Sequence, residues 1–442
     1  MAKKAGKGFI LVCLQLLLCF SQLNCIRAKG EDGSDDEIKG MFVFGSSLVD
    51  NGNNNYLENS TAKADFLPYG IDFPKGPSGR FTNGKNVIDL LGEMLKLPCL
   101  IPPFSDPSTK GSKVVHGVNF ASGASGILDD TGFLAGQVIS LNQQIRNFET
   151  VTLPEVKKQL GVNRRENRKA MKKYMFIMGT GGNDYLFNYF VRKGEYNVSL
   201  ETFTVNLTTS LSHQLKKLYR LGARKFVLMS VYPLGCSPML NALRKDGCIE
   251  VMNQAAILFN DGLKSIIDAA KSDMPTSNLV LVNSYNIVTD IIQNPSSKGF
   301  KDANNPCCEV VPLTQLAGNG VSCKKGGRIC MDRSAHVFFD GLHPTEKVNV
   351  EIAAKAFTSD LKTEVYPINF HGCNNNLSDC LLAPVRALVV TRRTCNGRNN
   401  GLVEETLWQV DKVWRYGASC GGTWHSAWGV RRCARGRTAL GG

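Results

Sequence analysis

The chain has 442 residues, of which 43% are hydrophobic and 20% are charged, proportions that are ordinary for a globular protein with a large buried core. Its net charge of +14 is unevenly distributed: the first 25 residues carry +3, residues 371–442 carry +6, and +5 remains for residues 26–370. This mild excess, without a basic stripe that also contains aromatic residues, argues against nucleic-acid binding by the body of the chain.

The N-terminus has the pattern of a secretory signal peptide. Three lysines precede Phe9–Phe20, a 12-residue apolar run, and small or polar residues follow it. We predict that residues 1–25 form the signal, with cleavage between Cys25 and Ala28, and that residues 26–40 form a flexible lead-in. A signal anchor is the alternative, but the apolar run is too short to span a bilayer. We therefore expect a secreted mature protein without a transmembrane anchor.

After residue 40, short apolar runs alternate with longer segments of helical period. The runs that we predict to be buried strands are Met41–Phe44, Gly117–Ala121, Tyr174–Met178, Phe226–Val231 and Leu279–Val282. The segments that we predict to be helices are Val87–Lys96, Leu141–Phe148, Val205–Leu221, Met252–Ala270 and Val348–Leu361. This alternation indicates right-handed crossovers and a parallel sheet covered by helices on both faces. Such sheets bind ligands at the carboxyl ends of their strands.

Three candidate functional residues fall at those strand ends. Ser47 follows the first predicted strand, Gly123 the second and Asn183 the third. A serine in this position can present its hydroxyl to the crevice, although a lone serine there is more often a helix N-cap. The Gly123 N–H and the Asn183 amide can donate to a developing oxyanion, although Gly-Gly-Asn-Asp by itself is typical of a turn.

A fourth motif supplies an acid and a histidine three residues apart. Asp340 and His343 can meet within one turn, so that the carboxylate holds the imidazole in the tautomer that accepts a proton from serine. Alone, such a pair is usually a local turn contact. Because all four motifs occur in one chain, they predict a serine hydrolase.

Five longer segments carry a resemblance to a known family. They are Phe42–Tyr56, Leu67–Pro74, Gly79–Gly84, Tyr232–Pro238 and Phe339–Glu346. In these segments the chain resembles the plant-type GDSL esterase/lipase family of the SGNH hydrolase superfamily, and the resemblance covers residues 41–370, the predicted hydrolase domain. It implies a flavodoxin-like, three-layer α/β/α sandwich on a five-stranded parallel sheet.

The same resemblance implies a role for each candidate residue. Ser47 is the implied nucleophile, His343 the base, and Asp340 the residue that orients the base. The implied oxyanion hole consists of the Ser47 and Gly123 N–H groups and the Asn183 side chain. No metal or other cofactor is implied.

The sequence departs from the family pattern at three places. Ser46 stands where the family has its signature aspartate, which is not a catalytic group, so we expect altered loop packing rather than an inactive enzyme. Phe339 replaces the usual tryptophan, an apolar exchange. Residues 371–442 extend beyond the family fold without a sustained helical or strand period, and we interpret them as a disordered tail or an artefact of the gene model; a real appended segment is the alternative. Within this tail, Gly417–Gly421 matches the G-x-S-x-G pattern, but no acid follows it, so we interpret the match as chance.

A secreted protein is expected to use its cysteines in disulfide bonds. We predict a bond between Cys236 and Cys248, which flank a segment rich in turn-forming and polar residues. A zinc site is the alternative, but no repeated CxxC pair supports it. Four further cysteines form a second cluster whose pairing the sequence leaves open: Cys307, Cys308, Cys323 and Cys330. Four N-glycosylation sequons suit the same compartment, at Asn59, Asn197, Asn206 and Asn376.

The leading hypothesis is a secreted, metal-independent serine esterase that forms an acyl-enzyme. Its substrates would be acyl or acetyl esters of lipids or of cell-wall components, met in the extracellular space or the cell wall. An acyltransferase, in which a hydroxyl group replaces water, is the alternative within enzymes. A catalytically silent binding protein is the alternative outside them: Ser46 is the one feature in its favour, and retention of all five candidate residues argues against it. The oligomeric state and the natural substrate cannot be read from the sequence.

Overall fold

The computed structural model describes residues 38–163, 166–192, 197–243, 247–312 and 320–370. The predicted signal peptide, most of the lead-in, the tail and the sequon at Asn376 lie outside these residues.

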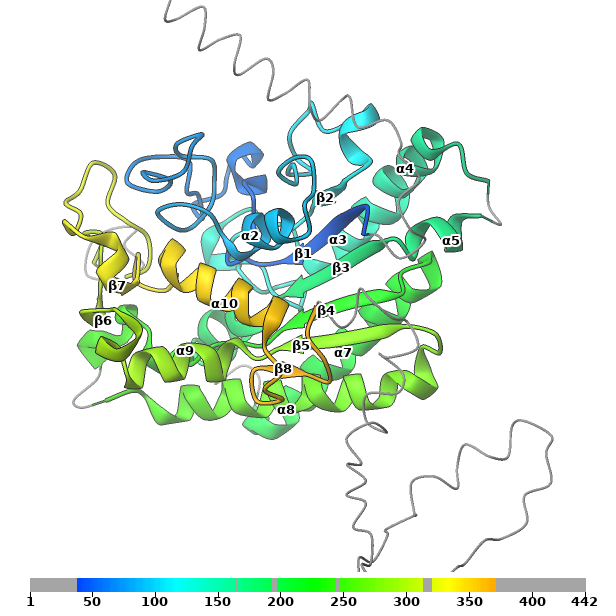
Figure 1. Cartoon of the computed structure of the whole chain (residues 1–442). Helices are drawn as coiled ribbons and strands as arrows, with labels where there is room; N and C mark the ends of the chain where they lie inside the picture. The colour runs from blue at the N-terminus through cyan, green and yellow to red at the C-terminus, as the bar shows by residue number, and fades with distance from the viewer. Residues whose placement is uncertain (1–37, 164–165, 193–196, 244–246, 313–319, 371–442) are drawn as a thin grey trace, which may run out of the picture. The chain divides into compact units, whose positions relative to one another are not determined.

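A six-stranded sheet forms the centre of the described fold (Figure 1). Its strands, in spatial order, are β2 (Gly117–Asn119), β1 (Gly40–Gly45), β3 (Tyr174–Gly179), β4 (Lys225–Met229), β5 (Asn278–Val282) and β8 (Val365–Tyr366). The first five are parallel, as predicted, and every residue in them is buried. Parallel strands covered on both faces require continuous apolar runs, which is why the runs stood out in the sequence. The short β8 adds an antiparallel edge to β5.

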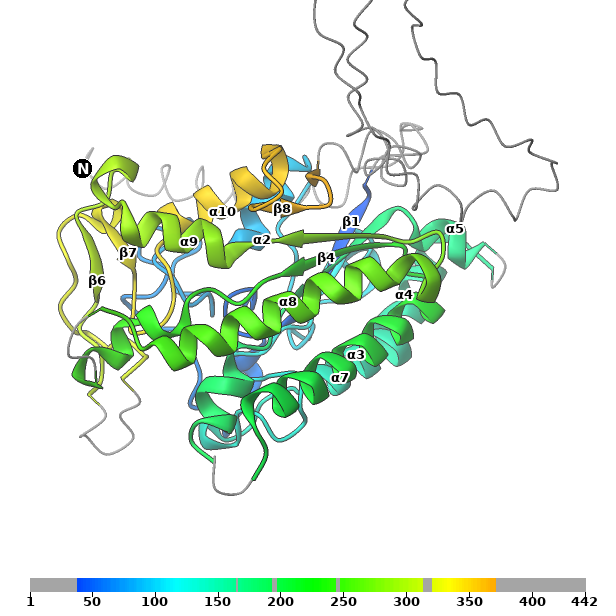
Figure 2. The same ribbon diagram turned by 90° about the horizontal axis from the view of Figure 1, so that it is seen from below.

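Helices cover both faces of this sheet, which confirms the predicted α/β sandwich (Figures 1 and 2). One face carries α2 (Val87–Met94), α9 (Ser284–Gln293) and α10 (Glu346–Thr358). The other carries α3 (Leu141–Asn147), α4 (Leu153–Leu160), α7 (Leu200–Leu221) and α8 (Glu250–Asp273). The short α5 (Asn167–Met171) precedes β3.

The helix α7 begins five residues before the predicted start at Val205. Ser199 caps it, because its hydroxyl accepts the Thr202 N–H, and the helix ends at Gly222, which adopts a left-handed conformation. Leu200, Phe203 and Leu207 lie at helical spacing and pack in the core, so the first turn of α7 carries an apolar period that the prediction overlooked.

A second, two-stranded sheet leads the chain to Asp340. It consists of the parallel strands β6 (Asp302–Pro306) and β7 (His336–Phe338). Two disulfide bonds, Cys307–Cys330 and Cys308–Cys323, cross-link the segment that follows β6. The Cys307 and Cys308 N–H groups donate to the Phe338 and Phe339 carbonyls, so the cross-linked segment runs along the chain that leads to Asp340.

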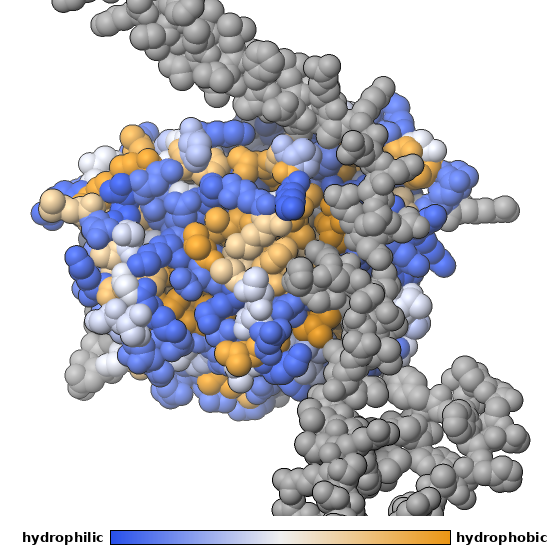
Figure 3. All heavy atoms as spheres, viewed as in Figure 1, coloured by the Kyte–Doolittle hydropathy of each residue, from blue (hydrophilic) through white to orange (hydrophobic). Residues whose placement is uncertain are grey.

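Polar side chains cover most of the face seen in Figure 3, and an apolar area lies near its centre, close to α2. Among the described residues, no helix combines the length and apolar character needed to cross a bilayer.

Candidate active site

The carboxyl end of β1 positions Ser47. Gly45 ends the strand with a φ of 139°, and a Cβ atom there would lie 2.1 Å from the Gly179 carbonyl oxygen. Only glycine therefore allows β1 to approach β3 so closely at this point. The Ser46 N–H then donates to the same carbonyl, and Ser47 follows as a buried residue at the edge of the sheet.

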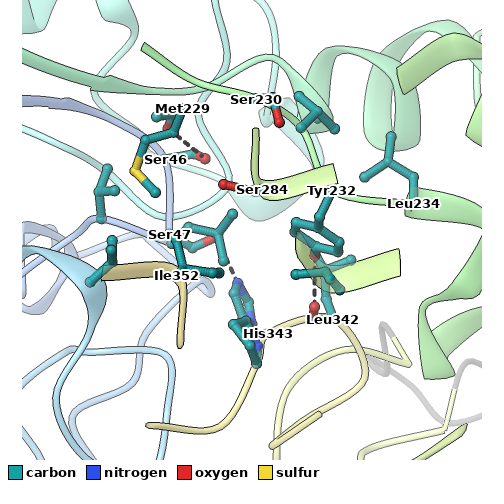
Figure 4. Close-up of a pocket in the computed structure, with 18 of the residues that line it drawn as sticks. Ser46, Ser47, Met229, Ser230, Tyr232, Leu234, Ser284, Leu342, His343 and Ile352 are labelled. Carbon is teal, nitrogen blue, oxygen red and sulfur yellow. Dashed lines mark hydrogen bonds between the residues drawn. The ribbon is translucent and has the colours of Figure 1, made fainter. Parts of the chain in front are cut away.

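His343 connects Ser47 to Asp340. The His343 Nε2 atom lies 2.7 Å from Ser47 Oγ (Figure 4). The His343 Nδ1 atom lies 2.8 Å from Asp340 Oδ2. An imidazole whose Nδ1–H donates to a carboxylate has a free lone pair on Nε2, which can accept the serine proton. The structure thus brings Ser47 to an acid–histidine pair whose histidine lies 296 residues further along the chain, in the arrangement that activates a serine nucleophile.

The Asp340 carboxylate is fully buried and held by further donors. Its Oδ1 atom accepts the N–H groups of Leu342 and His343 at 2.8 and 2.7 Å, which closes the turn between acid and base. Its Oδ2 atom accepts the Tyr69 hydroxyl at 2.7 Å. Burial, reinforced by the charge of Asp340, raises the pKa of Tyr69 well above its usual value, so this hydroxyl remains a donor.

Tyr69 also joins Asp340 to the disulfide-bonded segment. Its oxygen accepts the Cys323 N–H at 3.0 Å, and Cys323 is bonded to Cys308. The sequence motif Leu67–Pro74 contained Tyr69, but nothing in its spacing revealed a partner 271 residues away. Its contact with Asp340 is one that the sequence analysis missed.

Asn183 lines the same pocket as Ser47 and His343. One amide hydrogen of Asn183 donates to the Ser125 carbonyl at 2.9 Å, which orients the side chain and leaves the second amide hydrogen for another acceptor. The next residue, Asp184, starts a π-helical turn (Asp184–Tyr189) and accepts the N–H groups of Ile127 and Leu128. The loop that carries Asn183 is therefore fixed to the loop that follows β2.

Gly123 is placed differently from the sequence expectation. Its N–H donates to Asp50 Oδ2 at 3.0 Å, so its single hydrogen already has an acceptor in this structure. Asp50 also accepts the N–H groups of Gly52 and Asn53, and burial raises its pKa to about 6 despite these donors. Asp50 thus ties the loop after Ser47 to the Gly123 loop, a second link that the sequence analysis missed.

A pocket of about 50 Å³ opens beside Ser47 and His343 (Figure 4). Its walls are mainly aliphatic and come from several elements, including Leu48, Val87, Met229, Val288 and Ile352. An apolar pocket next to a nucleophile suits the hydrocarbon part of a substrate.

The remaining predicted positions are the cysteines and the glycosylation sequons. The Cys236–Cys248 disulfide is present, which confirms that prediction, and the second cluster pairs as described above. Cys307, Cys330 and His336 lie within reach of one another, but the two cysteines are bonded together and so do not offer two thiolate ligands. Three sequon asparagines are exposed: Asn59, Asn197 and Asn206.

Comparison with known proteins places this geometry in context. The sequence profile of the GDSL-like Lipase/Acylhydrolase family matches residues 41–356. The chain is 39% identical over 361 residues to GDSL esterase/lipase At1g29670 of Arabidopsis thaliana, an alignment that covers 80% of this chain and 95% of that protein. It is 40% identical over 359 residues to GDSL esterase/lipase At5g08460 of the same plant, covering 78% and 90% respectively.

Proposed function

Because this chain belongs to the GDSL-like lipase/acylhydrolase family and is a carboxylic ester hydrolase, we propose that Ser47 is its nucleophile, His343 its general base and Asp340 the residue that orients the base. The observation that carries the proposal is the unbroken hydrogen-bonded chain from Ser47 Oγ through both ring nitrogens of His343 to Asp340. Burial of all three side chains keeps water from competing for these bonds.

In the proposed reaction, Ser47 Oγ attacks the ester carbonyl carbon while its proton passes to His343 Nε2. The carbonyl oxygen becomes an oxyanion, and collapse of the tetrahedral intermediate breaks the bond to the alcohol, which takes the proton from His343. A water molecule then gives a proton to His343 and attacks the acyl carbon. When this second intermediate collapses, the acid leaves and Ser47 Oγ takes the proton back from His343. Asp340 stabilises the His343 imidazolium during both acylation and deacylation, without taking its proton.

We assign the oxyanion hole to the Ser47 N–H and to the second amide hydrogen of Asn183. Donors fixed before the reaction stabilise the charge without reorganisation, and the bond from Asn183 to Ser125 supplies such fixation. For Gly123 we propose a conditional role: its N–H joins the hole only by exchanging Asp50 for the oxyanion as the charge develops.

The proposed setting is extracellular. The predicted signal at residues 1–25, the three described disulfide bonds and the exposed sequons all suit secretion. The substrates proposed are esters of lipids or of cell-wall components, and residues 41–370 are proposed to form the complete catalytic domain.

Two neighbouring serines allow a sharp test of the nucleophile. Ser46 Oγ lies 3.4 Å from the Gly179 carbonyl, whereas Ser47 Oγ contacts the base. Ser47→Ala should abolish hydrolysis of p-nitrophenyl butyrate and labelling by a fluorophosphonate probe, while Ser46→Ala should keep most of both. Probe labelling mapped to Ser46, or equal loss in the two variants, would show that the assignment is wrong.

A further inference from the structure

Four hydroxyl side chains lie along the inner end of the pocket, just beyond the strands of the sheet. Gly45 of β1 pairs with Gly179 of β3, and the register of β3 with β4 continues this row to Met229. The residues that follow these three positions are Ser46, Thr180 and Ser230, and Ser284 starts α9 shortly after β5. All four line the pocket.

Two of these hydroxyl groups already have partners. Ser46 Oγ donates to the Gly179 carbonyl, and Ser230 Oγ accepts the Tyr285 N–H at 3.0 Å. These two side chains are therefore explained by the packing of the strand ends.

The other two hydroxyl groups have no such explanation. Ser284 is 4% exposed and Thr180 is 7% exposed, and among the described residues neither hydroxyl oxygen has a hydrogen-bond partner. Figure 4 shows the Ser284 hydroxyl directed into the space between Ser46 and Ser47. A buried hydroxyl without a hydrogen-bond partner lowers the stability of the folded protein. Two such hydroxyls in one pocket therefore indicate a ligand atom that hydrogen-bonds to them.

The remaining walls restrict what this ligand can be. None of the described residues that line the pocket is an aspartate, glutamate, lysine or arginine, so nothing there would balance a charged substituent. The volume of about 50 Å³ accommodates about four water-sized groups, since each needs about 10–15 Å³. A short, uncharged group with one hydrogen-bonding substituent fits these limits.

The reaction identifies which half of an ester would occupy the pocket. The acyl group stays bound to Ser47 until water arrives, whereas the alcohol must first leave toward solvent. A pocket that opens beside Ser47 and is walled by buried side chains suits the half that stays.

We propose that this pocket is an acyl subsite for a short, uncharged acyl group that carries a hydroxyl, which hydrogen-bonds to the Ser284 or the Thr180 hydroxyl. The proposal rests on the role assigned to Ser47 above. It adds a preference within ester hydrolysis: the enzyme selects an oxygenated acyl group over a hydrocarbon group of the same shape.

Two ethyl esters of nearly equal shape test this preference. Ethyl 3-hydroxybutyrate and ethyl 3-methylbutyrate differ by a hydroxyl in place of a methyl group and release the same alcohol. We expect kcat/KM, measured with the purified full chain by titrating the released acid, to be at least about tenfold higher for the hydroxy ester, because the methyl group leaves both buried hydroxyls unpaired.

The variants assign the preference to particular side chains. Ser284→Ala or Thr180→Val, whichever removes the hydroxyl that contacts the acyl group, should lower the ratio of the two kcat/KM values toward 1. Thr289→Val is the matched control: Thr289 lies on the same helix and its hydroxyl also has no partner among the described residues, but it does not line the pocket, so the ratio should stay at its wild-type value.

The outcomes separate this inference from the function on which it rests. Equal kcat/KM values for the two esters in the wild type, or a ratio that neither Ser284→Ala nor Thr180→Val changes, would overturn the subsite; water alone would then satisfy the two hydroxyls. Hydrolysis that survives Ser47→Ala would overturn the proposed nucleophile as well.

Discussion

The substitution Tyr69→Phe tests whether the Tyr69 hydroxyl helps to orient Asp340 for its contact with His343. In Tyr69→Phe the Asp340 carboxylate loses a donor at 2.7 Å, and the buried Cys323 N–H loses its acceptor at 3.0 Å. A hydrogen bond to a charged group contributes about 1.5–3 kcal/mol and a neutral one about 1 kcal/mol, so the free energy of unfolding should fall by about 3 kcal/mol. The carboxylate should also be oriented less firmly, so kcat/KM for p-nitrophenyl butyrate should fall about tenfold, equivalent to about 1.4 kcal/mol of transition-state stabilisation.

Tyr174→Phe is the matched control for this experiment. The Tyr174 hydroxyl donates to the Val115 carbonyl at 2.7 Å, at the end of β3 remote from Ser47. This variant should lose about 1 kcal/mol of stability in urea titrations and none of its kcat/KM. If Tyr69→Phe kept its full kcat/KM, or if both variants lost activity equally, Tyr69 would have no special part in positioning Asp340.

Three further predictions concern metal independence, the tail and pH. Activity should survive EDTA, because the proposed mechanism uses only the side chains of this protein and water; loss of activity that zinc or calcium restores would contradict the mechanism. A chain ending at Phe370 should be secreted at least as well as the full chain and show equal activity per mole, since the described motifs and strands all precede that residue; failure of this chain to fold would make the tail a structural element. Burial raises the pKa of Asp184 to about 6, so its contribution to stability is complete below the ordinary value near 3.8 and is lost as pH rises through about 6. The wild type should therefore lose about 2 kcal/mol relative to Asp184→Asn between pH 4.5 and pH 7.5 in urea titrations, and an unchanged difference would refute the effect.

The sequence predicted the parallel strands well because burial on both faces demands uninterrupted apolar residues. It did not predict β8, because a two-residue strand has no period to detect. The helix α7 was predicted too short, because the prediction overlooked the cap at Ser199 and the apolar Leu200 and Phe203 of its first turn. Local signals were therefore sufficient for the five buried parallel strands but not for the two-residue strand β8.

In the candidate site, a contact between residues close in sequence could be predicted, whereas contacts between distant residues could not. Asp340 and His343 lie close in sequence, so their contact could be predicted from spacing. The Asp50–Gly123 and Tyr69–Asp340 hydrogen bonds join loops that only the folded sheet brings together, and no pattern in the sequence predicts these bonds. The pairing of Cys307 and Cys308 was undecidable because adjacent cysteines offer the same sequence separation to either partner, whereas the folded chain gives each a different neighbour.

The long sequence separation between Ser47 and His343 has a consequence for incomplete chains of this protein. A ribosome completes the serine early and its histidine 296 residues later. Under the proposed mechanism, every nascent chain, premature termination product or proteolytic fragment that ends between them carries a nucleophile without a base. Such chains would be inert toward the esters of the cell that makes them, so hydrolytic capacity would arise only once the last α/β unit has emerged and folded.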